Sequence, residues 1–270
     1  MKSTEPRKLL FTISSYAYLE PLFLASGELE RAEVDRKTFP DGERYLRLAA
    51  DTWGRDVVLL GGTPTDLDWL EVYDLAFAIT RGGARSLSIV MPYFGYSTME
   101  RAVKPGEVVT AKTRAMLISA IPPCEAGTRL FLFDLHTDGI EFYFGERHIT
   151  RHIYEPAFVY KQRDSSTGAL QMTGINADVK GREIVIYDDM IRTGSTLVQA
   201  GRAYLEAGAT KVHAIASHLV LPGSSLETIQ NAGVFTTILG TNSHPGSQKL
   251  AAGNVASVAD LLMQALVRPR

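Results

Sequence analysis

The sequence predicts an α/β protein with two lobes, each built on a mainly parallel sheet flanked by helices. Short apolar runs of strand length alternate with longer helical patterns along most of the chain. Most of these runs are rich in Val, Ile, Leu and Phe on both faces, which is typical of strands that helices cover on both sides. Because strand, helix and strand in succession form right-handed crossovers, this order favours parallel pairing.

The individual elements follow from these patterns in chain order. Apolar runs predict strands at residues 9–14, 56–61, 86–93, 129–135, 157–161, 183–187, 211–218 and 235–240. Helical patterns predict helices at 66–81, 111–121, 196–207, 225–231 and 258–267, and Gly82, Gly83 and Gly208 stand where helix C-terminal caps belong. Two stretches depart from the alternation: 31–39 with 43–48, around a Pro40-Asp41-Gly42 turn, and 140–144. Both are predicted to be antiparallel additions or flaps.

The boundary between the lobes is expected in the polar stretch 145–156, which contains Arg147, His148, Arg151 and His152. We therefore predict an N-terminal domain of residues 1–146 and a C-terminal domain of residues 147–270. The sequence contains no solenoid repeat and no low-complexity linker.

Composition excludes several classes of protein. Apolar residues make up 45% and charged residues 21% of the 270 residues, which excludes a mostly disordered, collagen-like or coiled-coil chain. The net charge of −2 provides no field for a nucleic-acid backbone or an anionic membrane. The single cysteine, Cys124, excludes an internal disulfide and a zinc ribbon, and it indicates a reducing cytoplasm.

Targeting and membrane segments are not expected. Lys2, Arg7 and Lys8 precede the apolar stretch 9–13, but Ser14-Ser15 interrupts that stretch, so we predict a buried strand rather than a secretory leader. No run of about 18 apolar residues is present to cross a membrane.

The segment 185–197, Val-Ile-Tyr-Asp-Asp-Met-Ile-Arg-Thr-Gly-Ser-Thr-Leu, carries the sharpest chemical signal. A strand ends in Asp188 and Asp189, and a loop of small residues then opens a helix. Backbone N–H groups at a helix N-terminus bind phosphate, and the strand-end carboxylates can accept hydrogen bonds from sugar hydroxyls. Together they fit a phosphorylated sugar. The same residues also fit an ordinary connection capped by Thr193 or Ser195 with two solvated acids, and their chemistry alone does not separate the two interpretations.

This segment resembles the phosphoribosyl-binding loop of the phosphoribosyltransferase fold, and its Asp-Asp-Met-Ile opening resembles the version in ribose-phosphate pyrophosphokinases (PRPP synthetases). Further segments resemble that family in the same order. Residues 39–43 resemble its adenine-binding turn, and residues 91–96 with Arg101, followed by 110–112, resemble its ATP-side strand end and next helix. Residues 133–136 resemble its Asp-Leu-His strand end, and residues 161–163 resemble its catalytic Lys-x-Arg loop. The resemblance covers nearly the whole chain.

The resemblance implies two phosphoribosyltransferase-like lobes, the second reduced, and transfer of the diphosphoryl group of Mg-ATP to the C1 hydroxyl of ribose 5-phosphate, giving PRPP and AMP. It assigns Phe39, Asp41, Glu43 and Arg101 to ATP, and Asp188, Asp189, Thr193, Gly194, Ser195 and Thr196 to ribose 5-phosphate. Lys161, Arg163 and His136 are the implied catalytic residues, and His136 is also the implied Mg²⁺ ligand. The adenine-binding turn of the family reaches a neighbouring subunit, which implies a homo-oligomer, a dimer or hexamer.

Each of these residues also has an ordinary structural interpretation. Phe39 can stack on a base, yet a buried Phe in a hairpin turn is common. His136 after a buried strand can ligate a cation or touch phosphates, yet a lone His is usually a satisfied core or surface residue. Lys161 and Arg163 flank a Ser/Thr/Gly-rich stretch that suits a loop closing over a phosphoryl group, yet solvated basic loops are commoner.

The chain departs from the family at two places. Thr98-Met99-Glu100-Arg101 replaces an Arg-Gln-Asp-Arg type sequence, so only Arg101 can be carried over. Between His136 and Lys161 the chain is several tens of residues shorter than family members. It has no counterpart there of the Ser-Pro-Asp-x-Gly-Gly-like loop that helps bind pyrophosphate and Mg²⁺.

Three functions remain open at this point. The first is the synthetase reaction. The second is a non-catalytic subunit that binds nucleotide or ribose phosphate, which the shortened segment favours and the retained Lys161, Arg163 and His136 oppose. The third is a plain phosphoribosyltransferase, which the Asp188–Thr196 loop permits but the two lobes and the adenine-type turn do not favour.

Overall fold

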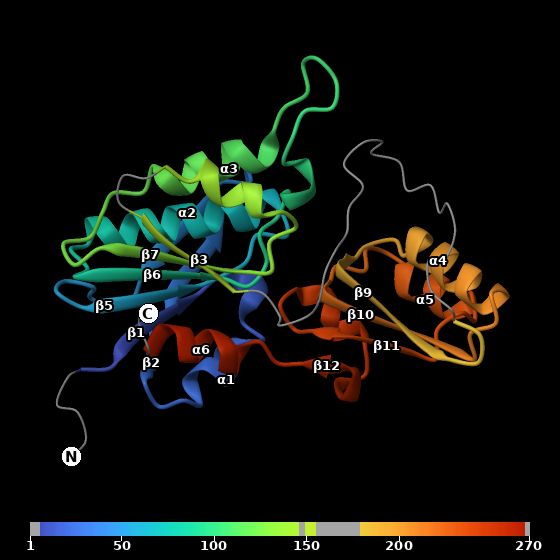
Figure 1. Cartoon of the computed structure of the whole chain (residues 1–270). Coiled ribbons are helices and arrows are strands. Elements are labelled where there is room, and N and C mark those ends of the chain that lie inside the picture. Colours follow the sequence, from blue (N-terminus) through green and yellow to red (C-terminus); the bar gives the residue numbers. More distant parts are fainter. Residues whose placement is uncertain (1–5, 146–148, 155–178, 268–270) are drawn as a thin grey trace. The chain divides into compact units, whose positions relative to one another are not determined.

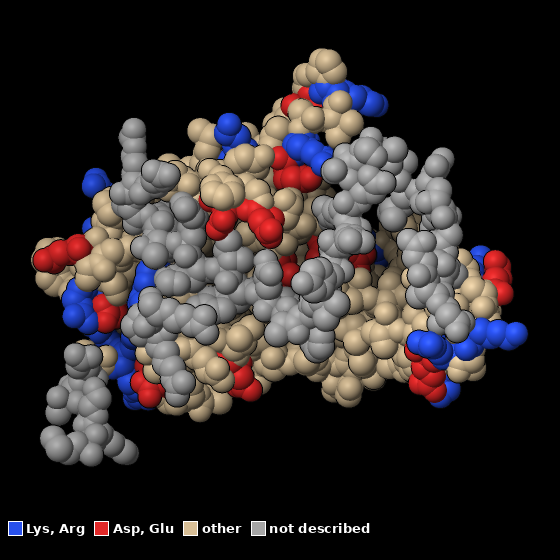
Figure 2. All heavy atoms as spheres, viewed as in Figure 1, with Lys and Arg blue, Asp and Glu red and all other residues tan. Residues whose placement is uncertain are grey.

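The computed structural model describes residues 6–145, the backbone of 149–154, and residues 179–267. The chain forms two compact units. The first contains the residues up to Tyr154 together with those from Val258 onward, and the second contains residues 155–257. On the face drawn in Figure 2, each unit carries both basic and acidic side chains, in keeping with the net charge of −2.

The first unit is built on a parallel sheet of six described strands in the order β2-β1-β5-β6-β7-β8. Its strands are β1 (Lys8–Thr12), β2 (Leu29–Arg31), β5 (Asp56–Leu60), β6 (Ser86–Met91), β7 (Thr128–Phe133) and β8 (Ile149–Tyr154). Helices α2 (Asp66–Arg81) and α3 (Thr110–Ser119) cover one face, and α1 (Glu20–Leu24) and α6 (Ala259–Val267) cover the other (Figure 1). The first unit also contains the 3₁₀ helices η1 (Ser14–Tyr16), η2 (Ser97–Met99) and η3 (Asp138–Tyr143).

Helix α2 shows why sequence patterns located its ends. Thr65 accepts a hydrogen bond from the Asp68 amide, and the Asp68 side chain accepts one from the Thr65 amide, so the two form a capping box. Gly82 ends the helix, as expected. The predicted range 66–81 is confirmed, and the face that carries Trp69 and Val72 is buried against the sheet.

The second unit contains a smaller parallel sheet, with described strands in the order β12-β11-β10-β9. Its elements are β9 (Glu183–Ile191), α4 (Ser195–Glu206), β10 (Lys211–Leu219), α5 (Ser225–Asn231), β11 (Thr237–Thr241), η4 (Pro245–Lys249), η5 (Ala252–Asn254) and β12 (Val255–Ala256). In this sheet, Leu219 and Ile191 pack with Leu197 of α4 and Ile229 of α5 in one apolar cluster.

An antiparallel hairpin stands apart from both sheets. Strands β3 (Val34–Thr38) and β4 (Arg44–Leu48) pair only with each other among the described residues, from Val34–Leu48 to Thr38–Arg44. Gly42 has φ +94°, the left-handed conformation that closes such a turn. This hairpin confirms the predicted pairing of 31–39 with 43–48.

Four expectations differ from the structure. Residues 140–144 form no antiparallel flap but belong to the 3₁₀ helix η3 and its C-cap, because Ile140 and Phe144, four residues apart, are both buried in the core. The polar stretch 145–156 is not only a boundary, since it contains β8, which pairs with β7 along its whole length. The C-terminal helix α6 packs in the first unit, where Leu262 and Leu266 are buried, and not in the unit of residues 155–257. Strands β2 and β12 and helix α1 were not predicted.

The predicted strand 157–161 lies outside the described residues. No helix in the described ranges is long and apolar enough to cross a membrane.

Buried polar side chains gather at the carboxyl ends of β10 and β11. His218 Nδ1 lies 2.8 Å from Ser243 Oγ, and Ser243 Oγ donates to the Ser217 carbonyl at 3.0 Å. His244 Nδ1 accepts from the Gly246 amide at 2.9 Å. Burial, and after it the neighbouring His218, lowers the pKa of His244 to about 4. His244 is therefore neutral near pH 7 in the folded protein.

We expect the second unit to lose stability as the pH falls from 6.5 to about 4. The unfolded chain takes up a proton on His244 near its ordinary pKa of 6.5, whereas the folded unit takes it up only near pH 4. The whole shift corresponds to roughly 3 kcal/mol. Hydrogen exchange of peptides from β10 in urea, at pH 7 and pH 5, measures this loss.

His244→Asn is the matched variant, because an Asn oxygen can still accept from the Gly246 amide but does not titrate. Its second unit should lose much less stability over the same pH range. Trp53 and Trp69 both lie in the first unit, so their fluorescence reports separately on that unit. An equal pH dependence of wild type and variant in the β10 peptides would contradict the assignment to His244.

Candidate functional site

The two acids of the strand–loop–helix segment lie near the carboxyl end of β9. Asp189 is buried, with 4% of its surface exposed, and Asp188 is half-buried. The Asp189 amide donates to Asp188 Oδ1 at 3.0 Å. Asp188 is paired with Ala216 of β10, a residue with a small side chain. The strand therefore places one carboxylate partly open to solvent at the edge of the sheet.

The loop after β9 opens directly into α4. Thr193, Ser195 and Thr196 are exposed, and the Thr193 and Ser195 hydroxyl oxygens lie 3.3 Å apart. Gly194 is the N-cap of α4, and no described side chain caps this end of the helix. The first N–H groups of α4 and two neighbouring hydroxyl groups thus face solvent together, which suits an oxyanion.

Gly194 is required by both backbone and packing. Its φ is +75°, and a Cβ atom built there would lie 2.3 Å from Ile229 Cδ1. Ile229 of α5 is 1% exposed, so an added Cβ would require this buried side chain or the loop to shift. The loop therefore packs closely against α5 at Gly194.

In the first unit, three of the four expected ATP residues lie at the tip of the β3–β4 hairpin. Phe39 is 38% exposed, and Lys37 Nζ lies 4.9 Å from its ring centroid. The Gly42 amide donates to the Phe39 carbonyl, and the Glu43 amide donates to Asp41 Oδ1 at 3.1 Å. The tip is thus an ordered turn that presents an aromatic ring and two carboxylates to solvent, and Phe39 is not the buried residue of an ordinary turn.

The segment after β6 is mostly buried up to Ser97, and Thr98 and Met99 are exposed. A Cβ on Gly95 would lie 1.9 Å from the Thr63 carbonyl oxygen, and the Gly95 amide donates to Thr63 Oγ1 at 2.9 Å. The segment is therefore anchored against the loop after β5. Arg101 is exposed, and its Nε lies 3.6 Å from Glu100 Oε1.

The segment after β7 has an unusual backbone. Asp134 is buried and has φ +43°, a conformation that non-glycine residues adopt rarely and that is enriched at functional sites. His136, two residues later, is half-buried, and Asp138 is exposed. Within the described ranges no group of three or more His, Cys, Asp and Glu side chains forms a metal cluster.

The expected catalytic residues Lys161 and Arg163 lie outside the described residues. The other expected residues fall into two groups. Phe39, Asp41, Glu43, Arg101 and His136 belong to the first unit, and Asp188, Asp189 and the Thr193–Thr196 loop belong to the second.

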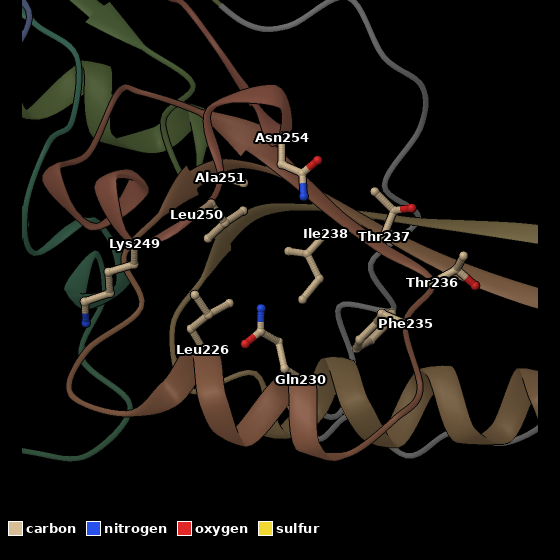
Figure 3. A pocket seen from close by; sticks show the side chains of 10 residues that line it. All are labelled: Leu226, Gln230, Phe235, Thr236, Thr237, Ile238, Lys249, Leu250, Ala251 and Asn254. Carbon is tan, nitrogen blue, oxygen red and sulfur yellow. The ribbon is translucent and has the colours of Figure 1, made fainter.

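One pocket of about 200 Å³ in the second unit coincides with none of the expected site residues. Leu226, Ile238 and Leu250 form apolar walls, and the Gln230 and Asn254 amides point between them (Figure 3). Its remaining lining residues are Phe235, Thr236, Thr237, Lys249 and Ala251. Lys249 Nζ is engaged by the carbonyl oxygens of Leu221 and Gly223, so its charge is not available to the pocket.

Sequence reasoning missed Glu71, a buried carboxylate on α2. Burial alone would raise its pKa, but hydrogen bonds from Arg44 and Arg36 outweigh burial and lower the pKa below its ordinary value. The only signal in the sequence was an acid on the helix face that also carries Trp69 and Val72.

The fold and the strand–loop–helix segment define a two-unit α/β protein of the phosphoribosyltransferase type. A model of the N-terminal domain of ribose phosphate pyrophosphokinase matches residues 8–121, and a model of the phosphoribosyl synthetase-associated domain matches residues 147–268. A ribose-phosphate pyrophosphokinase from Saccharolobus solfataricus is 30% identical over 248 residues, which cover 78% of this chain and 84% of the relative. The chain belongs to the ribose-phosphate pyrophosphokinase family.

Other relatives agree over more of the chain. A ribose-phosphate pyrophosphokinase from Gloeobacter violaceus is 29% identical, with 98% of this chain and 90% of the relative covered. That alignment spans 306 residues, more than the 270 of this chain, so the relative carries segments that this chain lacks. The place of these segments between His136 and Lys161 stays a prediction from the sequence.

The fold is shared with a solved structure. The crystal structure of phosphoribosylpyrophosphate synthetase from Mycobacterium smegmatis superposes with a TM-score of 0.79 at 20% identity, covering 97% of this chain and 99% of that one. The predicted fold class is thus confirmed.

If the loop after β9 holds ribose 5-phosphate, as the resemblance implies, Gly194→Ala should weaken binding of this substrate. The added Cβ must displace either Ile229 or the loop, and the strained φ adds about 1–3 kcal/mol, so we expect the KM for ribose 5-phosphate to rise by about tenfold or more. The KM for ATP should stay within about twofold, a shift of less than half a kcal/mol. Steady-state kinetics with each substrate varied in turn measures both.

Gly181→Ala is the matched control. Gly181 also has φ +75° and lies in the second unit, but a Cβ there meets nothing within 4 Å. It should lose stability from the same backbone strain without a change in KM. If both variants shift the KM for ribose 5-phosphate equally, the loop has no special role.

Proposed function

We propose that this protein transfers the β,γ-diphosphoryl group of ATP to the C1 hydroxyl of ribose 5-phosphate, giving PRPP and AMP. The observation that carries the proposal is the match to the ribose-phosphate pyrophosphokinase family over nearly the whole chain, together with the segment 188–196, which runs from the last residues of the parallel strand β9 into the first turn of α4. In the reaction, the C1 oxygen attacks the β-phosphorus and loses its proton. The bond from that phosphorus to the oxygen of AMP breaks.

The second unit would hold the sugar. The Asp188 and Asp189 carboxylates accept hydrogen bonds from the ribose hydroxyls, and the exposed N-terminus of α4 with the Thr193, Ser195 and Thr196 hydroxyls binds the 5-phosphate. This arrangement fixes the C1 hydroxyl relative to the sheet edge. Most of the rate would come from such positioning and from charge stabilisation.

The first unit would hold ATP. Phe39 stacks on the base, Asp41 and Glu43 accept from its amino group, and Arg101 contacts the phosphates. Lys161 and Arg163 stabilise negative charge on the transferring phosphoryl group. A homo-oligomer, in which one subunit's hairpin serves a neighbour's nucleotide, is part of the proposal.

Mg²⁺ is the cofactor that this chemistry requires. The donors near the end of β7, His136 and Asp138, are too few for an all-protein cage among the described residues but fit an ion held mainly through nucleotide phosphates and water. When bound, the ion neutralises charge on the phosphates.

A non-catalytic binding subunit is not favoured. The relatives that match this chain are named as the enzyme. The match to an N-terminal pyrophosphokinase domain likewise argues against a plain phosphoribosyltransferase.

A ³¹P NMR time course with protein, Mg²⁺, ATP and ribose 5-phosphate tests the proposal. We expect a new C1-linked diphosphate signal that rises in step with AMP. Unchanged ATP and ribose 5-phosphate, in a sample whose melting temperature ATP raises, would instead establish a binding protein without the activity.

Lys161→Ala should lower turnover far more than ATP binding. The loss of a cation that acts on developing charge should lower kcat by about a hundredfold or more, while the Kd for ATP, measured by calorimetry, changes little. Gln162→Ala, an uncharged change at the next position, is the control. Equal losses in kcat and ATP affinity would contradict a catalytic role for Lys161.

A further inference from the structure

Glu71 connects three parts of the first unit that are distant in sequence. It projects from α2, and its side chain is only 3% exposed. Oε1 accepts from Arg36 Nε at 2.8 Å and from the Ser14 amide and hydroxyl at 3.1 Å each. Oε2 accepts from an Arg44 Nη at 2.5 Å. One carboxylate therefore joins α2, the segment after β1 and both strands of the hairpin.

The two arginines lie on one face of the hairpin. Arg36 pairs with Leu46, and Arg44 pairs with Thr38, so the arginines stand diagonally across the two strands. Arg44 pairs at the last position of the ladder before the turn, directly beside Glu43. The carboxylate therefore holds the hairpin near its tip.

Further hydrogen bonds fix the direction of both guanidinium groups. Arg36 Nη2 donates to the Thr12 carbonyl at 2.7 Å, and Arg44 Nη1 donates to the Leu67 carbonyl at 3.3 Å. Each arginine thus bridges Glu71 and a backbone oxygen of the element behind it. A guanidinium group that is held by several hydrogen bonds fixes the direction of its side chain and provides charge.

The hairpin has few other restraints. A two-stranded ribbon is marginally stable by itself. Val34 and Leu48 pack on the core at the base of the hairpin, and Leu46, which pairs with Arg36, packs on it midway along the two strands. Nearer the tip, Arg44 connects the hairpin to α2 through Glu71 and through the Leu67 carbonyl, so a loss of the Glu71 contacts weakens the hold of α2 on the turn 39–43.

We propose that Glu71, through Arg36 and Arg44, is the positioning residue that orients the β3–β4 hairpin for nucleotide binding. The inference rests on the proposed function, because it takes the exposed ring of Phe39 and the carboxylates of Asp41 and Glu43 as the ATP-binding groups. Glu71 itself touches no substrate and acts only by holding the turn in place.

Glu71→Gln tests the proposal, because it keeps the shape of the side chain and removes its charge. We expect the KM for ATP to rise by about tenfold, since a charge-assisted hydrogen bond contributes about as much as one factor of ten in an equilibrium constant. The kcat at saturating ATP and the KM for ribose 5-phosphate should stay within about twofold of wild type. A purely structural role would lower the melting temperature and the active fraction without this selective change in KM.

Asp35→Asn is the matched control. Asp35 forms an ion pair with Arg47 on the outer face of the same hairpin, where both side chains are largely exposed. This pair lies within the hairpin and does not reach α2. Its loss should leave the KM for ATP unchanged, and a rise equal to that of Glu71→Gln would overturn the proposal.

Arg44→Gln tests the same contact from its other side. Arg44 is more exposed than Glu71, and its removal leaves no unpaired cation beside Glu71. It should raise the KM for ATP in the same direction. The double variant Arg44→Gln with Glu71→Gln should raise the KM for ATP no more than the stronger single variant does, because both changes break the same contact. Fully additive effects would show that the two residues act independently and would overturn the proposal.

The outcomes separate this inference from the proposed function. If wild-type protein forms no PRPP, the function fails, and calorimetry with ATP alone still tests whether Glu71→Gln weakens nucleotide binding. If wild type is active and Phe39→Ala raises the KM for ATP but Glu71→Gln does not, the function stands and the positioning role of Glu71 fails.

Discussion

The parallel pairing of the strands is the constraint on which the rest of the molecule depends. Because all strands of a parallel sheet point the same way, the segments that follow them meet at one edge. In the first unit these are the segments after β1, β6 and β7, which carry Ser14, Gly95 and His136. In the second unit it is the segment after β9, with Asp188 and the α4 N-terminus. Within each unit, the segments that follow these strands therefore lie along one edge of the sheet.

Both units use a few buried polar groups to hold these segments in place. Glu71 restrains the hairpin and the segment after β1, and the His218–Ser243 pair restrains the ends of β10 and β11. Such groups add little net stability, because the hydrogen bonds mainly offset the cost of removing polar atoms from water. What they contribute is a defined direction for the loops, which a purely apolar core specifies less well.

A reaction that depends on positioning suits this construction. Phosphoryl transfer requires little covalent chemistry from the protein, so a scaffold that places two substrates and a few cations is sufficient. This chain lacks segments that a relative from Gloeobacter violaceus carries, so it tests how much of the family's chain this construction requires.

The sequence alone determined the local features of this protein. The apolar runs of β1, β5 and β6, the capped helix α2 and the Asp188–Thr196 loop are each encoded within a few neighbouring residues, and they were predictable for that reason. The resemblance of several such segments, in order, then led to the family.

Only the tertiary structure decided the features that join distant segments. The helical form of 138–143, the place of β8 in the first sheet and the packing of α6 on the first unit all depend on which apolar surface is nearby. Glu71 is the clearest example. An acid in a helix has many possible partners, and only folding brings Arg36, Arg44 and Ser14 within hydrogen-bonding distance of it. A buried carboxylate is costly unless such partners surround it, and the tertiary structure alone shows which residues they are.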